Sequence, residues 1–341
     1  FMNCTVRSVS SIGNLTEIGD SAFYNCPYLV VFELPDGLET IGANAFYGCV
    51  AITWGDFTLP ASVTTVGEYA FCGNYGITGF TVPAQLTAIA DGMFAQCKNL
   101  TKVTLHDNVT EIGGYAFRKC EALEEIALPE SVTTIGEACF AETGLKKIAL
   151  PSALSEIPAY CFYGDRALTE ITVPASVTGV GNFAFYQTTA LKNLDLANVR
   201  ELGSYALIGS AVETLRADRL ETVGNYTFFG TAIASLNLPE LTVIGDYAFA
   251  NMEKLTAFSA EKTETVGVAA FYRTAKLREL NLPACKDIGD YAFMLASSLE
   301  EINLGKLEKL GTYAFYSTRL TKLSLPATVE SIAPGAFITK A

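Results

Sequence analysis

One short motif recurs along the whole chain at a nearly constant spacing, and this repetition limits the possible folds more than any other feature. The motif reads aliphatic-Gly-x-x-Ala-Phe, as in residues 18–23, 112–117 and 244–249. Solenoid proteins have periods of this length, because each unit buries its apolar face only against its neighbours. The last position of the motif is Phe in every copy except one Leu, and its fifteen copies lie 21 to 25 residues apart, at residues 23, 46, 71, 94, 117, 140, 162, 185, 207, 228, 249, 271, 293, 315 and 337.

A second motif precedes each copy from the second onward and predicts a β-strand. It reads Leu-x-x-Ile-x-Leu, usually followed by Pro, as in residues 123–129, 168–174 and 277–283. Its final part alternates apolar and polar residues, which is the period of a strand. The Pro ends the strand because it cannot donate a hydrogen bond to a neighbouring strand. A second short apolar stretch follows, as in residues 131–136, and predicts a second, shorter strand.

The end of each repeat predicts a bend and then helical turns. Gly follows the aliphatic residue in twelve of the fifteen copies, and Ala90, Pro158 and Ala333 replace it in the others. Such a glycine predicts a tight bend with unusual backbone angles. The x-x-Ala-Phe segment then predicts one or two helical turns. We therefore expect a right-handed β/α superhelix with a long parallel sheet, short second strands and short helical turns.

The columns continue from end to end, which predicts a single solenoid over residues 1–341. The last strand residue and the next aliphatic residue are seven apart from Leu128 to Ile135 but six apart from Leu282 to Ile288. This difference predicts two sub-blocks, about 1–195 with mainly 23-residue repeats and 196–341 with mainly 21–22-residue repeats. Residues 1–4 align with residues 94–97, and only four residues follow Phe337. Because solenoids need polar caps, we expect the natural chain to be longer.

The two motifs together resemble the BspA-like class of leucine-rich repeats. Residues 123–140, LEEIALPESVTTIGEACF, and 168–185, LTEITVPASVTGVGNFAF, match that pattern at nearly every position, and the resemblance covers essentially the whole chain. It implies a leucine-rich-repeat solenoid that is secreted or on the surface of a host-associated bacterium or a protist, with an adhesive role. It implies no enzyme activity and no defined site motif. Functions of other leucine-rich-repeat classes are not transferred, because Pro usually replaces the Asn that commonly follows the strand.

Composition excludes two classes of partner. The formal net charge is −13, so the chain lacks the basic stripe that nucleic acid requires. Half of the residues are apolar, yet no stretch approaches the roughly 18 consecutive apolar residues that a membrane-spanning helix needs. The first residues also lack the pattern of a signal peptide.

Chemistry-bearing residues are sparse. The single histidine, His106, excludes a two-histidine metal site and is interpreted as a turn residue. The acidic pairs at residues 124–125 and 300–301 lie at polar strand positions and are interpreted as solvated. We therefore predict a protein without catalytic residues, metal or cofactor, and not an enzyme.

Nine cysteines fall on repeat positions. Most lie three residues after the Phe column, and Cys139 and Cys161 lie one residue before it. Their odd number and the lack of a Cys-x-x-Cys favour buried free thiols that act as small apolar side chains. Disulfides between Cys26 and Cys49, or between Cys97 and Cys120, stay open, because neighbouring repeats bring each pair together.

Tyrosines also form columns. Tyrosine is enriched at binding hot spots, so one column provides a candidate aromatic stripe. The alternative is that the rings pack between adjacent repeats with their hydroxyls in water. The stripe comprises Tyr205, Tyr226, Tyr247, Tyr291 and Tyr313.

The polar strand positions form the exposed face of the predicted sheet, which we expect to be flat and without aromatic anchors. This face is the candidate surface for a partner. Its residues are Lys102, Glu125, Lys147, Glu170, Asp195, Arg216, Asn237, Asn281 and Asn303.

The function expected from these features is that of a non-enzymatic, extracellular or cell-surface scaffold for protein binding or adhesion. Its partner is expected to be a protein of the host matrix or of another cell surface, and the chain itself a monomer. One alternative is a structural spacer that presents another domain. The other is a carbohydrate-binding or hydrolytic role, against which the lack of an evident cleft counts.

Overall fold

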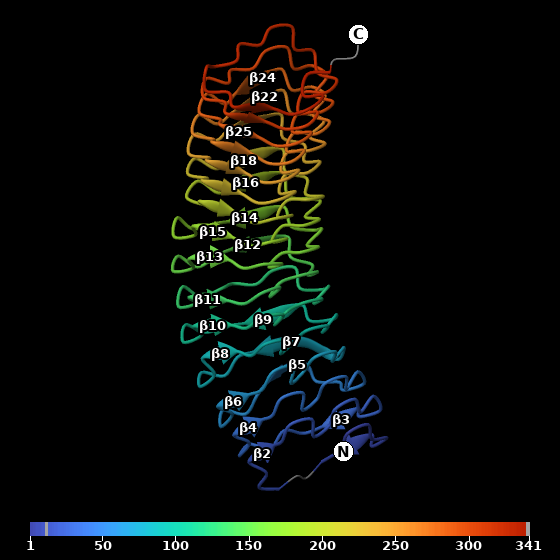
Figure 1. Ribbon diagram of the computed structural model, residues 1–341. Helices are drawn as coiled ribbons and strands as arrows, with labels where there is room; N and C mark the ends of the chain where they lie inside the picture. The colour runs from blue at the N-terminus through green and yellow to red at the C-terminus, as the bar shows by residue number, and fades with distance from the viewer. Residues whose placement is uncertain (11–12, 339–341) are drawn as a thin grey trace. The chain divides into compact units, whose positions relative to one another are not determined.

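The computed structural model describes residues 1–10 and 13–338 and contains two compact units, residues 1–174 and 175–341. Each unit is a stack of coils, one coil per repeat (Figure 1). A coil contributes one strand at the Leu-x-x-Ile-x-Leu motif and a two-residue strand before the glycine, and strands of successive coils pair in parallel. These features confirm the predicted repeat solenoid with short second strands. The segment after Phe337, on which the expectation of a missing cap rests, consists mostly of residues 339–341, which lie outside the described residues.

In the first unit, the strands at the Leu-x-x-Ile-x-Leu motif form three short parallel sheets, and six of the seven before the glycine form two more, of three strands each. The first series consists of β1 (Ser8–Val9), β3 (Val31–Phe32), β5 (Gly55–Thr58), β7 (Ile77–Thr81), β9 (Lys102–Thr104), β12 (Lys147–Ala149) and β14 (Glu170–Thr172). The second series consists of β2 (Glu17–Ile18), β4 (Thr40–Ile41), β6 (Thr65–Val66), β8 (Ala88–Ile89), β10 (Glu111–Ile112), β11 (Thr134–Ile135) and β13 (Glu156–Ile157).

In the second unit, the strands before the glycine pair without interruption from β15 to β27. They are β15 (Gly179–Val180), β17 (Glu201–Leu202), β19 (Thr222–Val223), β21 (Val243–Ile244), β23 (Thr265–Val266), β25 (Asp287–Ile288), β26 (Lys309–Leu310) and β27 (Ser331–Ile332). The other series consists of β16 (Asn193–Asp195), β18 (Thr214–Arg216), β20 (Ser235–Asn237), β22 (Ala257–Ser259) and β24 (Glu279–Asn281).

Some predicted strands are not formed. Residues 123–128 run as extended chain without strand pairing, and near residue 303 only an isolated bridge joins Asn281 and Asn303. The apolar residues of these coils still point inward, since Leu123 and Ile126 are buried. The hydrophobic pattern therefore determines which side chains enter the core, whereas strand hydrogen bonding varies from coil to coil.

Each unit is built around its part of the Phe column. In the first unit Phe117 stacks on Phe94 and Phe140, with ring centroids 6.0 and 5.8 Å apart. In the second unit Phe271 stacks on Phe249 and Phe293 at 5.1 Å. All these rings are fully buried. Parallel coils in register place the same repeat position of each coil over that of the last, so one buried Phe per repeat becomes a continuous stack.

The predicted helical turns are wrong, because the described residues contain no helix. Around Phe249 the backbone takes left-handed angles on both sides, with φ of 54° at Tyr247 and 57° at Asn251. The N–H groups of residues 247, 249 and 251 then donate to carbonyls of the next coil, each at 2.8 Å. Those of residues 248 and 250 close turns within the coil. Every second N–H thus bonds between coils, which an α-helix would prevent.

The predicted reason for the repeated glycine, a bend with unusual backbone angles, is also wrong. These glycines lack the positive φ that the prediction assumed, whereas positive φ occurs elsewhere in the coil. Except at Gly19, where an added Cβ would meet nothing within 4 Å, they are needed because successive coils approach closely at this point. A Cβ on Gly289 would lie 2.8 Å from the carbonyl carbon of Gly267 and the nitrogen of Val268, and one on Gly245 would lie 2.7 Å from that of Gly224.

The residue after the glycine joins the coils through its side chain. Asp246 Oδ1 accepts a hydrogen bond from the backbone N–H of Val268, and Asn225 Oδ1 accepts one from that of Asp246, both at 2.8 Å. Asp20 does the same for Ala43 at 2.7 Å. These bonds satisfy backbone donors that lie outside the strands.

Candidate functional site

The candidate face of the first unit gathers four charged residues of alternating sign. Lys102, Glu125, Lys147 and Glu170 come from four successive coils and are all exposed. Lys147 on β12 lies directly opposite Glu170 on β14 in the strand register. The four side chains line one surface hollow of about 620 Å³.

The floor of this hollow is apolar. It is formed by Val103, Ile126 and Ile148, which are at most 7% exposed. The hollow crosses the coil at residues 123–128, where the chain lies between β9 and β12 without pairing as a strand. The face is therefore hollowed here, whereas the sequence suggested a flat one.

These four charges are not neutralised by ion pairs within the described residues. Some neighbouring charges are paired. Lys146 Nζ lies 2.6 Å from Glu124 Oε2, and Lys98 Nζ lies 3.1 Å from Glu121 Oε1. A partner that pairs with the four charges of the hollow does not have to break an existing ion pair. The hollow of the second unit is likewise lined by charges that form no ion pair among the described residues, at Arg278, Glu279 and Glu301, so what sets the first hollow apart is the alternation of sign over four successive coils.

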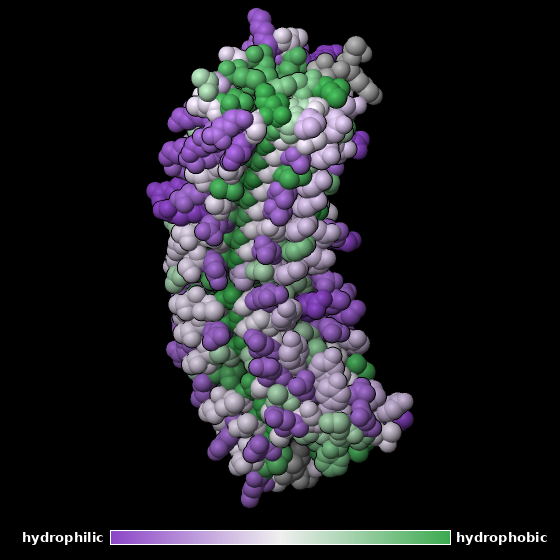
Figure 2. Space-filling view, viewed as in Figure 1, coloured by the Kyte–Doolittle hydropathy of each residue, from purple (hydrophilic) through white to green (hydrophobic). Residues whose placement is uncertain are grey.

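The candidate face of the second unit is more nearly neutral. Arg216 pairs with Asp195 on the neighbouring strand at 3.6 Å and with Asp218 at 2.8 Å. The asparagines Asn237, Asn281 and Asn303 lie in one column of the sheet register, with Ser259 between the first two. They line a hollow of about 530 Å³. Figure 2 shows polar and apolar residues interspersed on one face of the molecule.

The tyrosine column falls into two short stacks in the second unit. Tyr226 stacks on Tyr205 at 5.1 Å and on Tyr247 at 4.7 Å, and Tyr291 stacks on Tyr313 at 5.8 Å. Ala269 holds the equivalent place between the stacks. Because neighbouring rings cover the ring faces, the stripe presents ring edges and hydroxyls to solvent and offers little flat surface to a sugar ring.

All nine cysteines are free thiols, so neither of the two disulfides left open by the sequence is present. The thiols three residues after the Phe column are more than small apolar groups. Cys49, Cys97 and Cys120 each donate their S–H to the carbonyl of the Phe in the preceding coil, at 3.0 to 3.2 Å. Burial raises the pKa of Cys49 to about 12, which keeps its thiol protonated and unreactive.

In the second unit threonine is the most frequent residue of this column. Thr231, Thr274 and Thr318 donate their hydroxyls to the Phe carbonyl of their own coil, at 2.7 to 3.0 Å. The column therefore supplies hydrogen-bond donors in both units, although Asp165 interrupts it in the first unit and Met252 and Ala296 interrupt it in the second. The sequence signal for it was the shared hydrogen-bonding ability of Cys, Thr and Asn at one repeat position.

His106 lies in a turn, as predicted. Its Nε2 lies 2.8 Å from the carbonyl of Pro83, and its Nδ1 accepts from the N–H of Asn108 at 3.1 Å. The described residues contain no group of three or more His, Cys, Asp or Glu side chains that could hold a metal ion, and no helix long and apolar enough to cross a bilayer.

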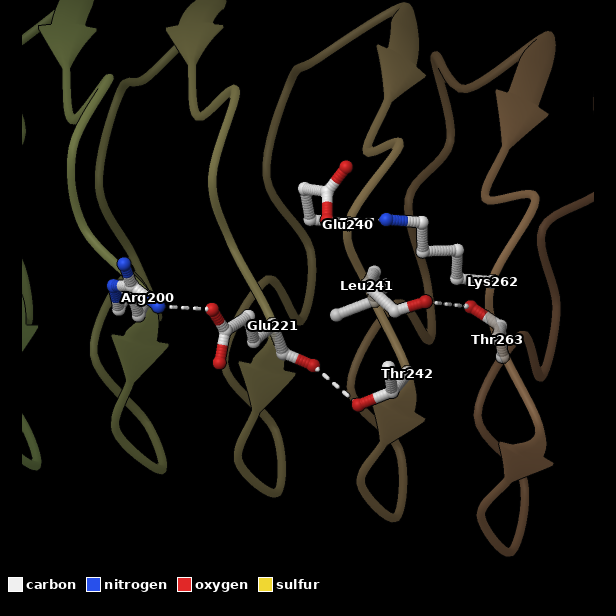
Figure 3. A network of polar contacts seen from close by, with 7 residues as sticks. All are labelled: Arg200, Glu221, Glu240, Leu241, Thr242, Lys262 and Thr263. Atoms are coloured by element: carbon white, nitrogen blue, oxygen red, sulfur yellow. Dashed lines mark hydrogen bonds and ion pairs between the residues drawn. The ribbon is translucent and has the colours of Figure 1, made fainter.

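Two polar features were missed by the sequence reasoning. Figure 3 shows a network on the second unit in which Arg200 pairs with Glu221 and Lys262 pairs with Glu240, both at 2.6 Å. The second feature is Asp165, which is fully buried in the first unit and accepts from the N–H and the hydroxyl of Thr143 at 2.6 and 3.0 Å. An acidic residue in a column filled mostly by Cys, Thr and Asn was its sequence signal.

The comparisons with known proteins agree with this architecture. A family profile described as "BspA type Leucine rich repeat region (6 copies)" matches residues 1–123, 87–213 and 221–340. A search of curated proteins finds no match. A solved structure, that of a leucine-rich repeat protein from Bacteroides ovatus, is 22% identical to this chain, with a TM-score of 0.64. The similarity covers 89% of this chain and 78% of that one.

A second solved structure, a leucine-rich repeat protein from Eubacterium ventriosum, is 23% identical with a TM-score of 0.55. The similarity covers 84% of this chain and 82% of that one. At these identities both structures support the fold alone. Since the family profile spans nearly the whole sequence, the chain belongs to the BspA-type leucine-rich repeat family.

Proposed function

We propose that this chain is a non-enzymatic scaffold, secreted or displayed on a cell surface, that binds a protein partner through the sheet face of its first unit. The observation that carries this proposal is the set of four exposed, unpaired charges, Lys102, Glu125, Lys147 and Glu170, around an apolar floor. Leucine-rich repeats are protein-binding scaffolds in general, and the family match supports that class of function for this chain.

The alternation of sign indicates what kind of partner fits. A partner of uniform charge would meet attraction at two of the four positions and repulsion at the others. A protein surface or extended segment that itself carries charges of both signs can match all four. Such pairs steer association and set specificity, and they weaken with salt because the charges are exposed.

The location and the identity of the partner rest on the family resemblance. BspA-like proteins are secreted or surface proteins, and adhesion to a host matrix protein or to another cell is the role that the resemblance implies. Affinity would come from contact area and repetition along the solenoid more than from one deep pocket.

The test is a solid-phase binding panel of matrix proteins and glycans, run with the purified chain at low and physiological salt. For each protein that binds, the double variant Lys102→Glu/Lys147→Glu is compared with Lys98→Glu/Lys119→Glu. The second variant makes the same change of net charge in the same unit at lysines already paired with Glu121 and Glu142.

We expect the first variant to lose binding about tenfold or more, since one lost charged contact is worth about 1.4 kcal/mol or more in affinity. The control should change binding little. Equal effects of the two variants would refute the sheet face as the binding surface. Failure of every protein on the panel to bind would favour the spacer role, and binding of glycans alone would favour a carbohydrate-binding module.

A further inference from the structure

Two cysteines at the start of the first unit lie in direct contact. Cys4 and Cys26 occupy the same repeat position in adjacent coils, and their Sγ atoms are 3.0 Å apart. The backbone N–H of Cys4 also lies 3.4 Å from the Cys26 sulfur. Among the described residues, no other two cysteines have their sulfur atoms in contact.

Cys26 also donates its S–H to the carbonyl of Phe1, at 3.0 Å, and the other thiols of this column bond in the same way. The sulfur of Cys49 donates to the carbonyl of Phe23, and that of Cys120 donates to the carbonyl of Phe94. Both are fully buried, so a soluble oxidant cannot reach them in the folded protein. Cys4, by contrast, is partly exposed, and its sulfur faces that of Cys26.

The backbone holds the two cysteines in suitable positions. Adjacent parallel chains lie about 4.8 Å apart, which is within the range of about 4.4 to 6.8 Å between the Cα atoms of disulfide-linked residues. Asn3, beside Cys4, donates its N–H to the carbonyl of Tyr24 at 2.8 Å, and Asn25 Nδ2 donates to Asn3 Oδ1 at 2.9 Å. The ring of Phe1 stacks on that of Phe23 at 5.3 Å. The two coils are therefore already aligned.

We propose that Cys4 and Cys26 form a disulfide when the folded protein meets a small-molecule disulfide such as oxidised glutathione. The bond would tie the first described coil to the second. It requires that the two sulfurs approach from their present contact and that Cys26 loses its hydrogen bond to the Phe1 carbonyl, with no change of register between the coils.

The reaction begins at Cys4, the more accessible thiol. The Cys4 thiolate attacks one sulfur of the oxidant, whose S–S bond breaks and releases one thiol molecule after protonation. Cys26 then loses its proton to solvent and attacks the Cys4 sulfur, which breaks the mixed disulfide and releases a second thiol molecule. Two protein thiols are oxidised, and one oxidant molecule is reduced to two thiols.

The second step is expected to be the slower one. Burial raises the pKa of Cys26, and the hydrogen bond with Cys4 raises it further. Only a small fraction of Cys26 is thiolate at neutral pH, so closure of the disulfide accelerates as the pH rises.

The test uses the whole chain, oxidised with excess oxidised glutathione under native conditions and then alkylated. Trypsin and a glutamate-specific protease release Cys4 in the peptide 1–7 and Cys26 in the peptide 18–33, each with no other cysteine. Mass spectrometry with and without reductant then identifies the linkage in the unmodified sequence. The matched variants are Cys26→Ser and Cys49→Ser.

We expect an intact monomer lighter by two hydrogens, with peptides 1–7 and 18–33 linked until reductant is added. Cys49→Ser should keep this link and Cys26→Ser should lose it. The proposal is overturned if peptide 1–7 is recovered only as the alkylated or glutathione-bound form, or if it is linked to another cysteine or to a second molecule. Because the unmodified chain alone decides between these outcomes, a variant that fails to fold does not affect the test.

Discussion

Replacing Phe271 by Leu tests whether ring geometry, beyond burial, stabilises the Phe column. Phe271 stacks on Phe249 and Phe293 at 5.1 Å and also meets the ring of Phe258 edge-on, at 4.9 Å and an interplanar angle of 76°. Phe293 is the matched control. It is equally buried, lies in the same unit and stacks on Phe271 and Phe315 at 5.1 Å, with no edge-on ring among the described residues.

Both substitutions remove similar apolar volume and should each cost about 1 to 3 kcal/mol of unfolding free energy. The edge-on contact adds about 0.5 to 1.5 kcal/mol, so Phe271→Leu should be the more destabilising by that amount. Both variants should fold, since Leu207 fills the same column and is fully buried.

The measurement is urea unfolding followed by circular dichroism, with slopes compared to verify that the transition is unchanged. A double-mutant cycle with Phe258→Leu isolates the ring pair, and a coupling energy of about 0.5 to 1.5 kcal/mol is expected. Equal costs for Phe271→Leu and Phe293→Leu, together with zero coupling to Phe258, would refute the reasoning and leave apolar burial as the whole effect.

Two further predictions concern a buried acid and a close approach of coils. Burial raises the pKa of Asp165 well above its usual range. The neutral acid therefore stabilises the fold fully below the pKa of about 3.9 that the group has in the unfolded chain. This contribution is lost as the pH rises through the pKa of the folded state. Asp165→Asn should therefore flatten the fall in Tm with rising pH, and parallel Tm–pH curves for the two proteins would contradict this. Gly289→Ala should lower the free energy of unfolding in urea by about 1 to 3 kcal/mol, because its Cβ would meet backbone atoms at 2.8 Å. Gly305→Ala is the control and should cost little, since the nearest atom to its Cβ would be 3.4 Å away. Similar costs for the two variants would argue against close approach as the reason for the glycine.

The outline of the candidate surface could be predicted from alternation alone. A strand that buries one face exposes every second residue, so Lys102 and Lys147 had to point outward wherever Val103 and Ile148 pointed inward. Whether those charges are paired could not be predicted. Pairing depends on side-chain reach between coils, and Lys146 finds Glu124 while its neighbour Lys147 finds no acidic partner among the described residues.

The backbone of the repeat end was the main error, and its cause is physical. The spacing of Ala and Phe in this segment suits a helical turn, and local sequence preference alone supports one. Hydrogen bonding to the next coil prevails instead, because residues such as Tyr247 adopt left-handed angles that direct alternate N–H groups across the stack. The stability of that arrangement comes from the neighbouring coil, which a local pattern does not contain.

The sequence by itself therefore determined the repeat, its period, the buried columns and the family, because a side chain that recurs at a constant interval must serve the same place in every coil. Only the tertiary structure decided what lies across from each residue in the adjacent coil. That contact placed Cys4 against Cys26, left Lys102 and Glu125 unpaired, and made Gly289 necessary for close approach instead of for a bend. Distances between coils follow from the packing of the whole stack, so they are absent from the pattern of any single repeat.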